Sequence, residues 1–341
     1  MNNRDQNSGL SFEERVSKKL ADRGFIDFCK RERNREDFDI YFSLVEKLAK
    51  VDISIVNFDK DVKKHSWTKT EAEKDLINFY AMIDNLSPSG TILLDRVEQN
   101  LKYLKYGDEK GGRSHCLLHV DKDGKVTREI YIKLDHEIND TIMLAHEFCH
   151  SLCECFINLA KEKDSRVDEI PSVIVDNLMS SYLESKYPEI KEEMKELDKK
   201  RQFVQIKKAR ECLLDGVIVK VVCGEISIDE AKQKYGYLFK PFKELLGQKL
   251  EQIENFKFFP MFEKKYLVPQ AISLQMRDRF KKNPENVATQ LKYLIENVHV
   301  LTEEQALDYL QLPSKEKLID NYIKDFPKRI KTLDDEKVKS R

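Results

Sequence analysis

Two histidines and a glutamate lie close together near the middle of the chain, in the segment His146-Glu147-Phe148-Cys149-His150. The surrounding residues 141–156 are mostly apolar, which is typical of a helix that packs into a core. On a helix, histidines four residues apart lie on the same face and can bind one metal ion. A glutamate beside the first histidine can then act on a metal-bound water, as in zinc metalloproteases. The alternative is a buried histidine pair without a metal.

A third ligand is expected, because a catalytic zinc ion usually has three protein ligands and one open position. Two adjacent acids, Asp168 and Glu169, follow His150 by 18 and 19 residues. That separation lets one helix end, so that an antiparallel neighbour can present a carboxylate. Either acid could instead only stabilise the start of a helix. Cys153 could also reach an ion, although small thiols more often pack between helices.

The remaining pattern is mainly helical. Helices are predicted over residues 11–23 (ending at Gly24), 36–50, 69–86, 89–106, 168–186, 188–222, 227–250 and 262–281. The one clear β signal is a hairpin over 116–134 with a turn around Asp123-Gly124. Its second strand, 126–134, could pair with an extended peptide or could be an ordinary edge strand. Gly111-Gly112 marks a boundary, so we expect an N-terminal helical region over 1–110 and a catalytic domain over 111–341.

The composition argues against several kinds of partner. Lys and Arg total 60 and Asp and Glu total 61, so neither nucleic acid nor a membrane is expected as a partner. Seven cysteines without a disulfide-like spacing, no signal core and no run of 18 apolar residues favour a cytoplasmic protein. Export by a non-Sec route would leave no trace in this sequence, and the oligomeric state is not indicated.

The sequence resembles the oligoendopeptidase F and thimet oligopeptidase family of zinc peptidases. Thr141-Ile142-Met143-Leu144-Ala145 looks like that family's approach to its metal helix, and Glu169-Ile170-Pro171-Ser172 is similar to its Glu-x-Pro-Ser segment. The resemblance covers roughly residues 126–312. It implies a multi-helix, zincin-like metallopeptidase fold, mainly α, with a small β-hairpin or sheet beside the active-site helix. It also implies Zn²⁺ held by His146, His150 and Glu169, with Glu147 as the general base.

The resemblance suggests roles for two further residues. Asp176 stands where the family usually has another acid, and helical spacing places it on the same face as Glu169. It could therefore orient a ligand histidine without touching the metal. Tyr266 lies in a segment that looks like the family's tyrosine-rich active-site segment, so it is the candidate donor to the oxyanion. The alternative for Tyr266 is a tyrosine at the edge of the core.

We therefore expect a zinc-dependent metallopeptidase, an endopeptidase or oligopeptidase whose substrate is a peptide or a protein. Two other functions compete with it. Phe262 and Lys264 stand where the family would have tyrosines, which suggests a non-catalytic binding protein on a peptidase-like fold. The chain is also shorter than typical family members, chiefly on the N-terminal side. An open cleft in a shortened protein would suit a dedicated protease with a single protein target, such as an effector or toxin.

Overall fold

The computed structural model describes residues 22–59, 61–107, 114–120, 126–154, 167–239 and 267–338. The chain forms two compact units. The first unit contains residues 1–54 and 202–264, and the second contains 55–201 and 265–341. Each unit takes residues from both predicted segments, 1–110 and 111–341. The proposed boundary at Gly111-Gly112 lies outside the described residues, so that division stays a prediction.

In the first unit the described helices are α2 (Arg23–Arg33), α3 (Phe38–Ala49), the second part of α8 (Lys191–Val222) and α9 (Ile228–Tyr235). The start of α2 corrects the prediction that Gly24 ends a helix. Asp22 caps α2 instead, because its carboxylate accepts a hydrogen bond from the Phe25 N–H at 3.3 Å. Gly24 therefore lies in the first turn, and residues 1–21 are outside the described part. The helix predicted over 36–50 is confirmed as α3.

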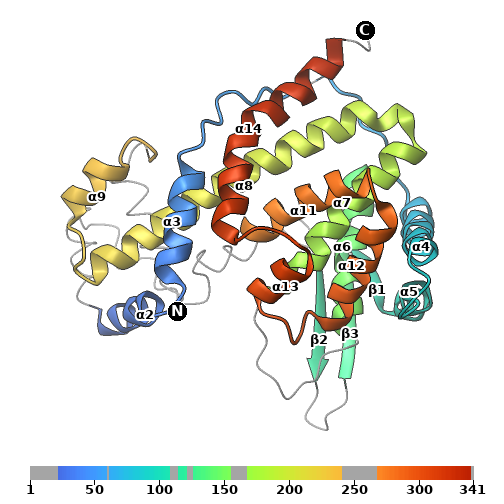
Figure 1. Ribbon diagram of the computed structural model, residues 1–341, viewed down its shortest axis with the longest axis horizontal. Coiled ribbons are helices and arrows are strands. Elements are labelled where there is room, and N and C mark those ends of the chain that lie inside the picture. Colours follow the sequence, from blue (N-terminus) through green and yellow to red (C-terminus); the bar gives the residue numbers. More distant parts are fainter. Residues whose placement is uncertain are drawn as a thin grey trace. The chain divides into compact units, whose positions relative to one another are not determined.

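In the second unit, helices pack around α7 (Glu169–Lys186). The other described α-helices of this unit are α4 (Lys69–Leu86), α5 (Leu93–Asn100), α6 (Ile138–Glu154), the first part of α8, α11 (Leu267–Phe280), α12 (Pro284–Asn297), α13 (Glu303–Tyr309) and α14 (Lys315–Val338). The helix α7 packs between α6 and α11 (Figure 1). Its buried residues, among them Ile170, Val175 and Leu178, lie on several faces, as expected of a central helix.

The second unit also contains a three-stranded sheet, in the order β1-β3-β2. Strands β2 (His115–Val120) and β3 (Val126–Lys133) are antiparallel, which confirms the predicted hairpin. Strand β3 is the central strand, because Ile130 and Tyr131 are paired with residues on both sides. The alternative of an ordinary edge strand is therefore wrong. At Ile130 and Tyr131 the strand offers no edge to a peptide, whereas among the described residues 126–129 are paired with β2 alone.

Strand β1 (Leu104–Gly107) corrects the helix predicted over 89–106. The helix α5 ends at Asn100, and a short 3₁₀ turn, Leu101–Tyr103, leads into β1. The strand then pairs in parallel with β3, with Leu104 opposite Ile130. This pairing partner is distant in sequence, so local helical periodicity could not reveal it.

The sheet packs against α6 through β3. The alternation predicted for β3 holds, since Ile130 and Ile132 are buried. The protein is thus mainly α, with a small sheet beside the helix that carries the histidine pair, as the sequence predicted. Among the described helices, none combines the length and apolar composition needed to cross a membrane.

Candidate metal centre

The helix α6 positions His146, Glu147 and His150. Its start is fixed by Asp140, whose carboxylate accepts the N–H groups of Asp135 and His136 at 2.9 and 2.7 Å. One helical turn separates the two histidines, and their ring centroids lie 4.8 Å apart. The helical reading of the pentapeptide is therefore correct, and both imidazoles lie on one face.

The first turn of α7 supplies the third group. Glu169 is its first residue and only 3% exposed. Its Oε2 atom lies 3.4 Å from His150 Nε2 and 3.6 Å from His146 Nε2. Among the described histidines, cysteines and acids, His146, His150 and Glu169 form a group that could hold a metal ion, and neither Asp168 nor Cys153 is part of it.

These three atoms have the spacing that a tetrahedral zinc site requires. The two histidine Nε2 atoms lie 3.2 Å apart, so the three separations run from 3.2 to 3.6 Å. Bond lengths of about 2.0–2.2 Å at a tetrahedral zinc place the ligand atoms about 3.3–3.6 Å apart. Two imidazole nitrogens and one carboxylate oxygen also form a common donor set of catalytic zinc sites. The residues present therefore fit a zinc ion.

Asp176 contacts the other nitrogen of the first histidine. Its Oδ1 atom lies 3.1 Å from His146 Nδ1. An ionised carboxylate can only accept a hydrogen bond, so Nδ1 carries the hydrogen and its N–H donates to Asp176. This leaves Nε2 directed at Glu169. Asp176 thus has the geometry expected of a group that orients a ligand histidine.

The charges around the histidines stabilise positive charge at this position. Burial alone would lower the pKa of His146, but Asp176, followed by Glu169, raises it well above the usual value. Burial alone would raise the pKa of Glu169, but hydrogen bonds with His146 and His150 hold it far below its usual range. A bound divalent cation would supply that positive charge and leave both imidazoles neutral.

Glu147 lies beside this group and is not one of its members. Its position next to His146 turns it about 100° around α6. The side chain is 5% exposed, and burial raises its pKa above the ordinary glutamate value. A carboxylate with a raised pKa is suited to accept a proton and later return it near neutral pH.

Two hydrogen bonds that the sequence did not predict join other helices to the residues that flank the pentapeptide 146–150. The Tyr80 hydroxyl of α4 donates to the Ala145 carbonyl at 3.1 Å, one residue before His146. The Asn100 amide at the end of α5 donates to the Ser151 hydroxyl at 3.0 Å, one residue after His150. Both donors come from the region that the sequence placed outside the catalytic domain. No local signal marks them, because each bond joins residues at least 51 positions apart.

Arg128 extends the second of these contacts to the sheet. Its guanidinium donates to the side-chain oxygen Oδ1 of Asn100 at 2.8 Å. The Ser151 hydroxyl in turn donates to the Phe148 carbonyl at 2.8 Å. A chain of hydrogen bonds thus links β3, α5 and α6 next to His150. The candidate oxyanion donor, Tyr266, lies outside the described residues, so its role stays a prediction.

Comparisons with known proteins bear on the fold. No protein-family model matches the sequence, and no curated protein matches it. A solved structure assigned as an oligoendopeptidase F from Bacillus anthracis str. Ames superposes with a TM-score of 0.56 at 13% sequence identity. The alignment covers 96% of this chain and 60% of that one. The chain shares the fold of that structure.

A second solved structure supports the same fold. It is assigned as a peptidase from Chlamydophila abortus, with a TM-score of 0.55 and 14% identity. It is matched over 93% of this chain and 56% of its own length. The present chain therefore spans less than two thirds of either structure.

Proposed function

We propose that the protein is a zinc-dependent metallopeptidase that hydrolyses peptide bonds. The observation that carries this proposal is the convergence of His146 Nε2, His150 Nε2 and Glu169 Oε2 at separations of 3.2–3.6 Å. Asp176 behind the first imidazole and Glu147 beside it complete the arrangement. The peptidase fold shared with the two solved structures adds support.

Each residue has a distinct role in the proposed reaction. His146, His150 and Glu169 hold the ion, and Asp176 keeps His146 in the tautomer that presents Nε2. When bound, zinc lowers the pKa of water to about 7 and polarises the scissile carbonyl. Glu147 takes the proton from the attacking water and delivers it to the leaving amine. Tyr266 remains the proposed donor to the oxyanion.

Digestion of a peptide library tests the function as a whole. We expect the zinc-loaded protein to cleave peptides, the chelated protein to be inactive, and added zinc to restore cleavage. Mass spectrometry of the products gives the cleavage sites, and intact proteins are tested in parallel. Cleavage of one intact protein alone would favour a dedicated protease. If the fully zinc-loaded protein cleaves no substrate, the proposed peptidase activity is contradicted, and a non-catalytic binding protein is favoured.

Replacing Asp176 by alanine is expected to weaken zinc binding. The His146 ring would lose the acceptor that fixes its tautomer, and loss of such a partner typically lowers metal affinity about 10–100-fold. Competition titration with a zinc-binding dye measures the affinity. Asp176→Asn keeps a hydrogen-bond acceptor beside Nδ1 and should recover part of the loss. Unchanged affinity in the alanine variant would exclude the orienting role.

A further inference from the structure

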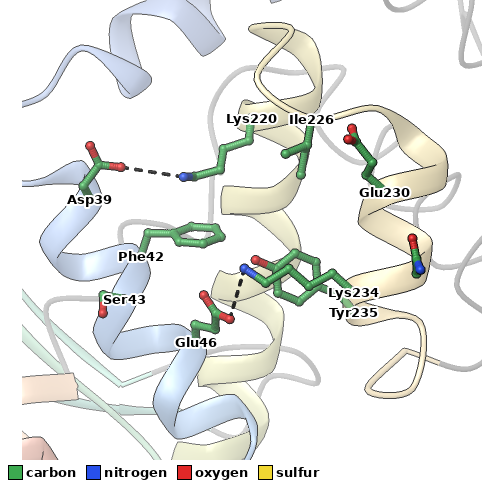
Figure 2. Close-up of a pocket in the computed structure, with 10 residues that line it drawn as sticks. Asp39, Phe42, Ser43, Glu46, Lys220, Ile226, Glu230, Lys234 and Tyr235 are labelled. Carbon is green, nitrogen blue, oxygen red and sulfur yellow. Dashed lines mark ion pairs between the residues drawn. The ribbon is translucent and has the colours of Figure 1, made fainter.

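The first unit has a pocket that takes no part in the proposed reaction. Its volume is about 660 Å³, which is within the range of small-molecule sites. One wall is formed by Asp39, Phe42 and Glu46 on α3, which lie at helical spacing on one face. Lys220 near the end of α8, Ile226 in the following loop and residues of α9 form the opposite side (Figure 2).

Two lysines of this pocket are held against aromatic rings. Lys220 Nζ lies 4.4 Å from the centroid of the Phe42 ring, and Lys234 Nζ lies 5.0 Å from the centroid of its neighbour Tyr235. The two rings meet edge to face, with centroids 6.4 Å apart. Figure 2 shows both lysine side chains extending toward α3. Each ammonium group therefore lies against one ring of the aromatic pair at the pocket wall.

The acids of the pocket pair only loosely with these lysines. Lys220 Nζ lies 3.7 Å from Asp39 Oδ1, which is longer than a hydrogen bond. Lys234 Nζ lies 3.4 Å from Glu46 Oε1, and the Lys234 side chain is 60% exposed. In each pair one side chain is largely exposed, and ion pairs at such distances stabilise a fold only weakly. Both acids have a second cationic partner, because Asp39 lies 3.2 Å from Arg33 and Glu46 lies 2.9 Å from Lys50. A lysine of the pocket can therefore turn to a ligand without leaving its carboxylate unpaired.

The signs of the lining charges indicate which ligand fits. Three carboxylates (Asp39, Glu46 and Glu230) and the ammonium groups of Lys220 and Lys234 line the same pocket, and the Glu230 carboxylate also accepts hydrogen bonds from Ser227 at the start of α9. A ligand with a single charge would meet a group of like charge wherever it bound. A ligand with both charges can place its carboxylate at a lysine and its ammonium at an acid. Ile226 adds apolar surface for a side chain.

We propose that this pocket binds a zwitterionic ligand, an unblocked amino acid or short peptide. Isothermal titration of the full chain tests this with L-phenylalanine and the dipeptide Leu-Phe as probes. A chelator is present, so that no carboxylate can bind through a metal at His146. We expect at least one probe to bind. N-acetylphenylalanine lacks the ammonium and phenylalanine amide lacks the carboxylate, so each should bind at least about tenfold more weakly than phenylalanine if the free amino acid is the ligand. Acetyl-Leu-Phe and Leu-Phe amide provide the same comparison for the dipeptide.

Variants locate the binding in this pocket. Lys220→Gln and Lys234→Gln should each weaken binding by about tenfold or more, with folding checked by circular dichroism. Lys232→Gln is the matched control, because Lys232 is on α9 but does not line the pocket. The proposal is overturned if neither probe binds at about 10 mM, if the blocked analogues bind equally well, or if Lys232→Gln weakens binding as much. None of these outcomes depends on peptidase activity, so the two proposals fail separately.

Discussion

Replacing Glu147 by glutamine is expected to abolish peptide hydrolysis and to leave the metal bound. Glutamine has nearly the same shape and can occupy the same buried position, but its amide cannot accept the proton from water. A positioned general base contributes about 10²–10⁴-fold to a rate, so kcat/KM should fall by that factor. Hydrolysis of a fluorogenic peptide gives the rate, and elemental analysis of the same sample gives the zinc content.

Glu184→Gln provides a control for this substitution. Glu184 is a partly buried glutamate on α7, about four turns beyond Glu169, and burial raises its pKa too. The variant should keep its activity, since Glu184 has no place near the histidines. If Glu147→Gln keeps full activity, Glu147 is not the general base. Loss of zinc together with activity would instead assign Glu147 to holding the metal.

Replacing Glu169 by alanine is expected to empty the metal site. The change removes one of three protein ligands and leaves two imidazoles, which rarely hold zinc alone. The affinity should fall at least about 100-fold, more than on removal of a group that only orients a ligand. Calorimetric titration with zinc measures the affinity, and zinc content after gel filtration shows whether the ion is retained.

The variant Asp168→Ala tests whether zinc binding depends on Glu169 specifically or on either of the two adjacent acids. Asp168 precedes α7 and makes no side-chain cap to it, and it does not belong to the group around the histidines. Its loss should therefore leave zinc binding close to that of the wild-type protein. Equal losses in both variants would show that Glu169 has no specific role. Undiminished zinc binding in Glu169→Ala would refute the third ligand, and with it the strongest support for a peptidase.

Local periodicity predicted the parts of the fold that depend on neighbouring residues. The helix over 69–86 has the predicted bounds because Thr68 and Glu71 form a capping box at its start. The pentapeptide 146–150 likewise predicts two metal ligands and a general base from five neighbouring residues. The choice of Glu169 over Asp168 needed the family resemblance, because two adjacent acids at a helix start look equivalent by spacing alone.

The features that were missed depend on contacts between distant segments. Leu104 to Tyr106 continue a helical pattern in the sequence, but they form a strand with Gly107 because β3 provides a pairing partner. The sequence indicated that a helix ends at Gly24, but Asp22, two residues earlier, caps the start of α2. No sequence pattern indicates the Tyr80 and Asn100 contacts. A tyrosine or asparagine on a buried helix face looks the same in the sequence whether or not it makes such a hydrogen bond.

The hydrogen bonds from Tyr80 and Asn100 define how small an active fragment can be. A fragment that begins after Gly112 would keep all the proposed ligands but lose both donors. The Ala145 carbonyl and the Ser151 hydroxyl would then lack these partners in a region that α4 and α5 normally cover. Any shortened version made for enzymology or crystallisation should therefore begin before the Thr68 cap, so that both helices remain.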